Sequence, residues 1–425
     1  MGSTFNLTAG SSNSAKIVLD GFCTSTYSPP AHRAGTSLSE RFIWGGAATV
    51  GGIAIFAGTK QPVDGTVSAF SNYYDETGTR TIGTSLSNAR GSMGAASVGD
   101  VAVFAGGSNG SGSSSTVDFY DSTGTRTTGA PLNSSRYALP AAAVDNLAVF
   151  AGGYTGSGSS STVDFYDGNG THTAGAPLGT ARQFGAATAV GDFAIIAGGS
   201  TGSWGSNMTK TTAVDFYDKN GTHSIGTPLG TGRDISTATT AGKLAIVAGG
   251  MISTGQGTDV TDYYDENGTR SDGTPMSAVK LWMNSTTVND LAIFPGGSSP
   301  SGYSASAVVD YYNESGERID GTPLTQARWG PQAAAVGNLA IVAGGSSAAG
   351  HVYVATADYY EFEGITKTSI VIPANSKYKF DGIHSAEQSA AVPTPFSANQ
   401  PISGYIKIGA QTLSGQQNGI GLFDA

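Results

Sequence analysis

The chain has few charged residues, one cysteine and no long apolar run. Asp, Glu, Lys and Arg make up 12% of its 425 residues, and the net charge is −10. This balance argues against a nucleic-acid partner, which requires a basic face to displace counterions. Because Cys23 is the only cysteine, an intrachain disulfide and a cysteine-based zinc site are both excluded. No segment has the length of a membrane span, so membrane insertion is not expected.

The first twenty residues lack the basic start and apolar core of a secretory signal. The surface must be covered largely by Ser, Thr, Asn and the 63 glycines, which is common in exported, wall-associated or virion proteins. We therefore expect a virion or extracellular surface location. Assembly into a phage particle is one route out of the cell that needs no signal peptide.

An apolar run that ends in glycine recurs seven times along the chain. The first glycines of these runs lie 46 to 51 residues apart, at Gly58, Gly106, Gly152, Gly198, Gly249, Gly296 and Gly344. Such a period, with a diglycine in most copies, is typical of a β-propeller. The sequence thus predicts an all-β fold with seven blades.

Each repeat divides into four short strands, which we call a to d. Residues 186–190 are small and apolar and suit the crowded innermost strand a, while 193–199 form an apolar strand b that is buried on both faces. Strand c is VDFYD at 163–167, and a turn of the Asp-X-Asn-Gly type leads into strand d. In the copy of this turn at 218–221, Gly221 allows the positive φ that a tight hairpin needs.

The ring is expected to close through the N-terminus. Strands a, b and c each occur seven times, the last c at 357–360, whereas internal copies of strand d number six. The segment HRAG at 32–35 resembles strand d and would supply the missing outer strand, which removes an open edge. The expected organisation is an N-terminal extension with one strand (1–29), the propeller (30–363) and a small C-terminal β-appendage (364–425). The termini could serve oligomerisation or particle attachment, or the appendage could cap the propeller edge.

The diglycine followed by an aromatic pair resembles the Kelch repeat. Gly106-Gly107 with Phe119-Tyr120 and Gly198-Gly199 with Phe216-Tyr217 carry the resemblance, which covers roughly residues 30–361. The tryptophan that Kelch units carry after the tyrosine is missing from every blade. The resemblance implies a Kelch-like propeller and transfers no activity, because its glycine and aromatic positions are structural.

Two enzymatic interpretations of such propellers find little support in the residues. A copper site like that of galactose oxidase needs a cysteine-crosslinked tyrosine and two histidines, whereas Cys23 lies outside the repeats. His172 and His223 occupy a position that is Arg80, Arg126 or Arg270 in other blades, so we expect them to be solvated outer-strand residues. The Asp-Gly-Asn-Gly-Thr segment at 167–171 resembles the Asp-box of sialidases, but hairpin chemistry explains it fully. We expect no cofactor, no metal site and no catalytic residues.

A cation before strand a and an aspartate in strand c recur in six blades. The cations are Arg90, Arg136, Arg182, Arg233, Lys280 and Arg328, and the aspartates are Asp118, Asp164, Asp215, Asp262, Asp310 and Asp358. A feature of every blade is usually structural, so we expect charge-assisted bonds that fix the loop before strand a. A ring of metal or anion sites is the alternative.

The residues that vary between blades point to a binding face. After the recurring cation the blades read GSM, YAL, QFG, DIS, LWM and WGP, and the first blade has FIW at 42–44. Because strand direction alternates, the b–c and d–a loops must emerge on one face. That face gathers Trp44, Tyr137, Tyr154, Phe184, Trp204, Trp282, Tyr303 and Trp329 as candidate ligand-binding residues. In the alternative interpretation, Trp44, Met93 and Phe184 point inward and plug the ring.

Aromatic side chains among Ser, Asn and Gly suit recognition of a glycan or a surface protein. The sequence therefore favours a non-enzymatic recognition or adhesion propeller, in its most specific form a phage tail or receptor-binding protein. The alternative is a carbohydrate-active enzyme, a hydrolase or a lyase, which would need at least two carboxylates that converge in one pocket.

Overall fold

The computed structural model describes residues 30–61, 65–203, 206–299, 304–347 and 352–362, and the backbone of six short strands nearer the termini. The chain divides into two compact units. One is Pro29–Gly364, and the other combines Met1–Ser28 with Ile365–Ala425. The regular elements of the described residues are all strands. Those residues contain no helix that is long and apolar enough to cross a membrane.

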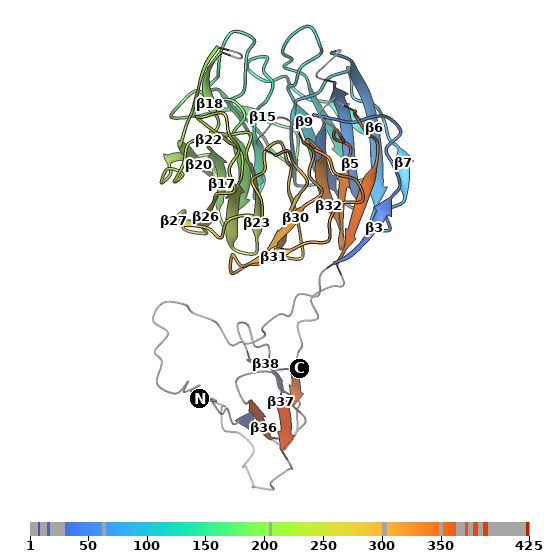
Figure 1. Ribbon diagram of the computed structural model, residues 1–425, viewed down its shortest axis with the longest axis vertical. Helices are drawn as coiled ribbons and strands as arrows, with labels where there is room; N and C mark the ends of the chain where they lie inside the picture. Colours follow the sequence, from blue (N-terminus) through green and yellow to red (C-terminus); the bar gives the residue numbers. More distant parts are fainter. Residues whose placement is uncertain are drawn as a thin grey trace. The chain divides into compact units, whose positions relative to one another are not determined.

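The larger unit is a seven-bladed β-propeller of four-stranded antiparallel sheets, as the repeat predicts (Figure 1). From strand a to strand d, the first three blades are β4 (Gly46–Val50), β5 (Ile53–Lys60), β6 (Val67–Asp75) and β7 (Arg80–Ile82); β8 (Gly94–Val98), β9 (Val101–Ala105), β10 (Val117–Asp121) and β11 (Arg126–Thr128); and β12 (Ala141–Val144), β13 (Leu147–Ala151), β14 (Val163–Tyr166) and β15 (His172–Gly175).

The fourth to sixth blades continue the same order. They are β16 (Ala186–Val190), β17 (Phe193–Ala197), β20 (Val214–Asp218) and β21 (His223–Ile225); β23 (Thr237–Ala241), β24 (Leu244–Ala248), β26 (Thr261–Asp265) and β27 (Arg270–Asp272); and β28 (Thr286–Val288), β29 (Leu291–Pro295), β30 (Val309–Tyr312) and β31 (Arg318–Asp320). The seventh contains β32 (Gln332–Val336), β33 (Leu339–Ala343), β34 (Ala357–Glu361) and the N-terminal β3 (Ala31–Gly35).

Two further strand pairs extend the loops of the fourth and fifth blades. They are β18 (Ser200–Ser203) with β19 (Ser206–Lys210), and β22 (Arg233–Asp234) with β25 (Met251–Ile252). The described strands of the smaller unit form two three-stranded sheets. One contains β35 (Ile370–Ile372), β2 (Ala15–Ile17) and β38 (Leu422–Asp424), and the other β1 (Leu7–Thr8), β36 (Lys377–Phe380) and β37 (Ala386–Ser389).

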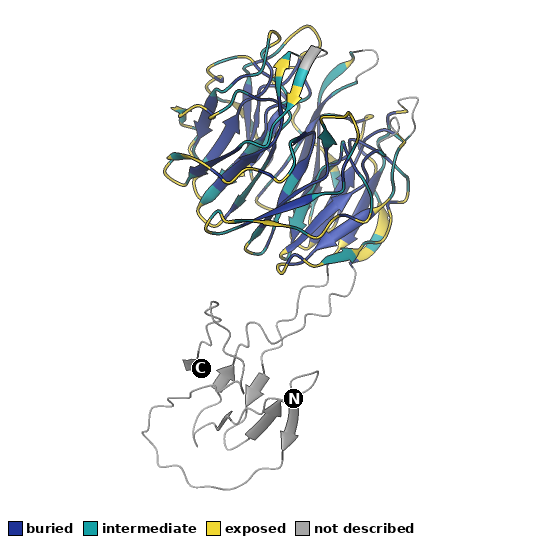
Figure 2. Ribbon diagram, turned by 60° about the vertical axis from the view of Figure 1, so that its left-hand side comes forward, coloured by how far each residue is buried: buried dark blue, intermediate teal, exposed yellow. Residues whose placement is uncertain are grey.

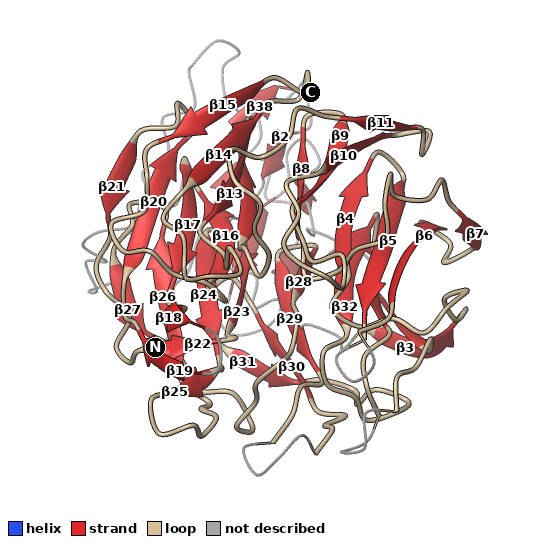
Figure 3. Ribbon diagram, turned by 90° about the horizontal axis from the view of Figure 1, so that it is seen from above, coloured by secondary structure: helices blue, strands red, loops and turns tan. Residues whose placement is uncertain are grey.

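Burial differs between the four strands of a blade and is greatest in strand b. The innermost strands, such as β4, β8 and β28, surround the axis in the view from above (Figure 3). Strand b is the most deeply buried, and β9 and β13 each keep only their first residue partly exposed. In Figure 2 most strands are dark blue, and the exposed residues lie in the loops and in outer strands such as β3 and β7. Apolar residues on both faces of strand b therefore pack between neighbouring blades.

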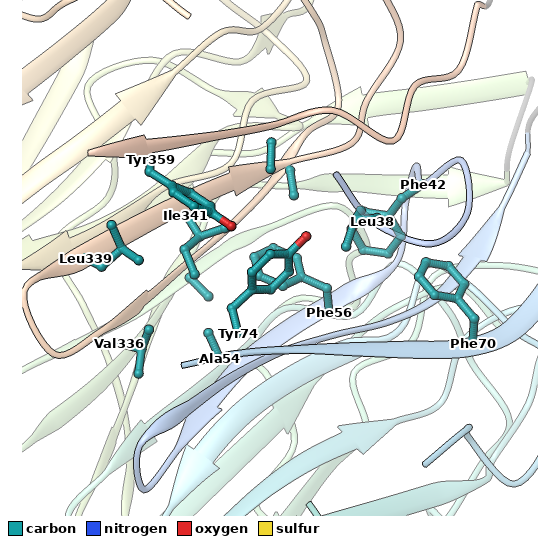
Figure 4. Packing of buried hydrophobic residues seen from close by; sticks show 13 residues of the cluster. Leu38, Phe42, Ala54, Phe56, Phe70, Tyr74, Val336, Leu339, Ile341 and Tyr359 are labelled. Atoms are coloured by element: carbon teal, nitrogen blue, oxygen red, sulfur yellow. The ribbon is translucent and has the colours of Figure 1, made fainter. Parts of the chain in front are cut away.

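Closure of the ring by the N-terminal strand is confirmed. β3 pairs antiparallel with β34, with His32 opposite Tyr360 and Ala34 opposite Asp358. Behind this seam, Tyr359 of the seventh blade meets Tyr74 of the first edge to face at 6.1 Å, within a shared apolar cluster (Figure 4). The first and last blades are thus joined by a hydrophobic core as well as by a strand.

The recurring charges form buried ion pairs, as expected. Arg90–Asp118, Arg182–Asp215, Arg233–Asp262 and Lys280–Asp310 are separated by 2.6 to 2.7 Å, and Arg136–Asp164 and Arg328–Asp358 are paired in the same way. The aspartate also accepts a backbone N–H from the d–a loop, as Asp164 does from Asn133 at 2.9 Å. Each pair therefore fixes the segment that leads into strand a.

The first blade replaces this ion pair with an uncharged pair. Phe42 occupies the position of the arginine, since Gly345 N–H donates to Phe42 O as Gly107 N–H donates to Arg136 O. Asn72 occupies the position of the aspartate and accepts the Ser39 N–H at 2.8 Å. The alignment of FIW with the residues after the arginine was therefore wrong by one position, because Phe42 does not look like a cation in sequence.

The expectation of solvated histidines was also wrong. His172 Nε2 lies 2.7 Å from Asp164 Oδ1, and His223 Nε2 lies 2.6 Å from Asp215 Oδ1. Both side chains are less than one fifth exposed. The outer-strand residue therefore supplies a second nitrogen to the buried aspartate. Either arginine or histidine can do so, which explains why both residue types occur at this position.

Candidate functional site

The b–c and d–a loops of each blade emerge together, as the alternating strand direction requires. Residues of the two loops form short antiparallel bridges, for example Gly91 with Ser108, Tyr137 with Tyr154 and Leu281 with Ser298. In the first blade, Lys60 N–H donates to Ile43 O at 3.2 Å. We call this side of the propeller the binding face.

Seven residues on this face, one from each blade, have a left-handed backbone. They are Trp44, Ser92, Ala138, Phe184, Ile235, Trp282 and Gly330, with φ between 46° and 64°. Neighbours are linked by backbone hydrogen bonds, such as Ala138 N–H to Ser92 O at 2.8 Å and Phe184 N–H to Ala138 O at 3.0 Å. We call them the left-handed ring. Only one of the seven is glycine, although a left-handed backbone favours glycine.

A cavity of about 560 Å³ opens at the left-handed ring. All seven ring residues line it, together with residues such as Lys60, Tyr137 and Trp329. A second space of about 310 Å³ lies between the inner strands and shares Gly45, Pro140 and Asn284 with the first. The two spaces therefore form one channel along the axis of the propeller. We call its wide end, the space of about 560 Å³, the axial cavity.

Aromatic side chains gather over one part of this cavity. The indole rings of Trp44 and Trp282 stack with centroids 5.4 Å apart. Phe184 meets Trp282 edge to face at 6.3 Å, and Trp329 lies tilted against it at 6.5 Å. Three of these residues, Trp44, Phe184 and Trp282, belong to the left-handed ring. The rings come from the first, fourth, sixth and seventh blades, so they meet only because the propeller closes.

The stacked indoles keep hydrogen-bonding capacity. The Nε1 atoms of Trp44 and Trp282 are buried, and no residue of the described chain accepts a hydrogen bond from them. A buried indole N–H usually finds an acceptor. Because these nitrogens are buried, a ligand in the axial cavity could reach them only if the stacked rings moved.

Tyr137 and Lys60 lie on another part of the cavity wall. Lys60 Nζ is 5.3 Å from the centroid of the Tyr137 ring and donates a hydrogen bond to Ser108 Oγ at 2.8 Å. Partial burial lowers the pKa of the Lys60 ammonium. Burial, together with the neighbouring Tyr154, raises the pKa of the Tyr137 phenol.

The structure divides the eight candidate residues into three groups. Trp44, Tyr137, Phe184, Trp282 and Trp329 line the axial cavity. Tyr154 is buried and packs edge to face against Tyr137 at 5.4 Å, so it supports the wall. Trp204 and Tyr303 lie outside the described residues.

Whether the aromatic residues line the face or plug the ring has a mixed answer. Trp44 and Phe184 point toward the axis and keep part of their surface exposed at the cavity. Met93 lines the cavity too, but it is buried among Leu86, Tyr73 and Tyr120 of the first two blades. The rings narrow the opening and leave the cavity in place.

Sequence reasoning missed Lys60, Ile235 and the pair Asn284–Gln332, whose side chains are hydrogen-bonded at 2.6 Å. One signal was available for Lys60, because the first blade reads Ala-Gly-Thr-Lys where most blades read Ala-Gly-Gly and a polar residue. Ile235 lies in the segment DIS, which gives no sign of a left-handed backbone.

The described residues that line the axial cavity and the channel below it include no aspartate and no glutamate. In the described part of the chain, no three His, Cys, Asp or Glu side chains form a group that could hold a metal ion. The polar groups of the wall are hydroxyls, amides and one ammonium. Such a wall can bind and orient a ligand by hydrogen bonds and stacking.

The strand pairing makes the larger unit a seven-bladed β-propeller. No protein-family model matches the chain, and no curated protein matches it. A solved structure entitled "Structure of YjhT" is 15% identical with a TM-score of 0.49, and the match covers 63% of this chain and 93% of that one. The resemblance to Kelch repeats therefore stays a prediction.

Proposed function

We propose that this propeller is a non-enzymatic recognition module that binds a glycan in the axial cavity and is displayed on a virion or cell surface. One observation carries the proposal. Six of the seven left-handed positions around the cavity hold a side chain where glycine would be least strained. A left-handed backbone costs a non-glycine residue of the order of 1–2 kcal/mol, and such strain gathers at ligand clamps.

The form of the cavity favours a glycan over a protein surface. A concave space of about 560 Å³ with walls from all seven blades has the size of a small-molecule site. Stable protein partners instead bury about 800 Å² on a broad face. The partly exposed rings of Trp44, Phe184 and Trp282 suit the apolar C–H faces of a sugar ring, and the hydroxyl, amide and ammonium groups of the wall suit its polar rim.

A carbohydrate-active enzyme is the alternative function. A glycoside hydrolase of the usual kind needs two carboxyl groups about 5 to 10 Å apart. The absence of carboxylates from the described wall of the axial cavity favours binding without hydrolysis. Release of reducing ends from a bound oligosaccharide would instead favour the enzyme.

A glycan array with the full chain tests the proposal. We expect retained glycans, and we expect Trp282→Ala to lose them because it removes the central member of the aromatic group. Phe193→Ala is the matched control, since Phe193 is a partly exposed aromatic at the start of β17, beside the a–b turn. If the wild-type chain retains no glycan, or if both variants bind as it does, the proposal is wrong.

A further inference from the structure

The loop that carries Lys60 is built differently from its counterparts. Where other blades have a second glycine, the first has Thr59, which is almost fully buried. Its hydroxyl accepts the Ile43 N–H at 3.0 Å and donates to Ile43 O at 2.8 Å. At the next position four other blades have buried serines, Ser108, Ser200, Ser298 and Ser346. The first blade therefore places a cation where the common pattern places a small hydroxyl.

Lys60 is the one charged side chain among the described residues that line the axial cavity. Its ammonium donates to Ser108 Oγ and pairs with no carboxylate of the described residues, although the chain has 31 acidic residues against 21 basic ones. Partial burial lowers the pKa of its ammonium, because burial disfavours the charged form. A partly buried ammonium that stands where four other blades have serine is a candidate for ligand recognition.

The remaining contacts of Lys60 orient its ammonium and leave it able to bind. An ammonium has three N–H donors, and Ser108 Oγ is an acceptor at 2.8 Å. The Tyr137 ring attracts the positive charge through its face and is not an oxygen or nitrogen acceptor, so it leaves N–H donors of the ammonium available. A ligand oxygen in the cavity can therefore receive a hydrogen bond from the same nitrogen.

We propose that the glycan bound in the axial cavity carries an anionic group, a carboxylate or a sulfate, which pairs with Lys60. The inference rests on the glycan-binding function proposed above. A sugar ring would stack at Trp44 and Trp282, while the anion would lie at the part of the wall formed by Lys60 and Tyr137. An asymmetric cavity with an aromatic part and a cationic part orients the ligand.

A glycan array of matched pairs, each printed with and without its carboxylate or sulfate, tests the inference on the full chain. We expect the acidic members to be retained over their neutral partners. Lys60→Met should weaken their binding about tenfold to a hundredfold, the usual worth of a hydrogen bond to a charged group. Lys60→Arg should keep the preference. Lys243→Met is the matched control, because Lys243 is highly exposed in the a–b turn between β23 and β24.

The outcomes separate this inference from the proposed function. Retention of neutral glycans without an acidic preference would overturn the inference and leave the function standing. No retained glycan would overturn both. Acidic glycans that bind Lys60→Met as tightly as the wild type would also overturn the inference. If Lys60→Met does not fold, the wild type still decides, since its binding to acidic glycans must weaken when salt rises from about 0.05 to 0.5 M. The carboxylated and sulfated arms identify the anion.

Discussion

Trp44 and Trp282 stack face to face at the axial cavity, with ring centroids 5.4 Å apart and planes inclined by 29°. They belong to the first and sixth blades, so the seventh blade lies between them in the ring. Both have a left-handed backbone, with φ of 52° and 54°. Their contact depends on closure of the propeller and on a backbone conformation that tryptophan rarely adopts. Five predictions follow from this arrangement and from the fold around it.

Trp282 and Trp329 should respond differently to truncation. The Trp329 side chain is 1% exposed and packs with Ile43 and Tyr353 in a buried cluster. Trp329→Ala should therefore lower the free energy of unfolding by about 3–5 kcal/mol. Trp282 is partly exposed at the cavity, and Trp282→Ala should cost only about 1–2 kcal/mol. Denaturant unfolding measures both. Equal losses would contradict the placement of the two rings.

The left-handed ring predicts that a glycine will stabilise the propeller. Ala138 has φ of 54°, so Ala138→Gly should raise the free energy of unfolding by about 0.5–1 kcal/mol as strain is relieved. Ala143→Gly is the control, since Ala143 lies in β12, where glycine should destabilise by a similar amount. Thermal unfolding of the two variants should shift in opposite directions. A lower melting temperature for Ala138→Gly would argue against a left-handed ring.

The uncharged pair of the first blade can be transferred to the second. Asp118→Asn should cost about 3–5 kcal/mol, because it leaves the buried Arg90 without its carboxylate. Arg90→Phe should cost less, because Arg126 still pairs with Asp118 at 2.8 Å. The double variant copies Phe42 and Asn72 and should cost less than the sum of the single losses. A double-mutant cycle of unfolding free energies measures the coupling. Additive losses would show that the first blade depends on other compensations.

The closing seam leaves no room for a side chain at Gly35. A Cβ there would lie 2.3 Å from the Tyr359 ring, whose hydroxyl donates to Gly78 O at 2.7 Å. We expect Gly35→Ala to destabilise by about 1–3 kcal/mol. Gly52→Ala is the matched control, because nothing lies within 4 Å of its Cβ position. A thermal unfolding temperature that is unchanged in Gly35→Ala would contradict the close packing of β3 on β34.

Acid should destabilise the blades through their buried aspartates. Burial alone would raise the pKa of Asp310, but the Lys280 charge and the hydrogen bonds from Lys280 and Ser277 together outweigh it and hold the pKa below the usual 3.8. For Asp358, the Arg328 charge and the bonds from Thr325 and His32 do the same against burial. A lowered folded-state pKa means that stability is complete above the unfolded pKa, near 4, and falls as the pH drops through the folded value. Melting temperatures from pH 7 to pH 3 should therefore decrease mainly below about pH 4.5. A flat profile there would contradict the prediction.

The amino-acid sequence by itself determined the blades and their closure. The period of the glycines, the Asp-X-Asn-Gly turns and the missing seventh strand d are local patterns, and β16 and β3 lie where those patterns predicted them. The binding face followed from alternating strand direction. The paired charges were also visible, because the same residues recur in six blades.

Only the tertiary structure decided which side chains share the axial cavity. Trp44, Phe184 and Trp282 come together through a left-handed backbone, and six of the seven ring positions lack the glycine that would reveal it. Lys60 meets Tyr137 because residues of the first and third blades line the same channel wall. A repeat pattern describes what the blades have in common. Contacts across the axis depend on the ways in which the blades differ and on the closed ring that brings them within reach.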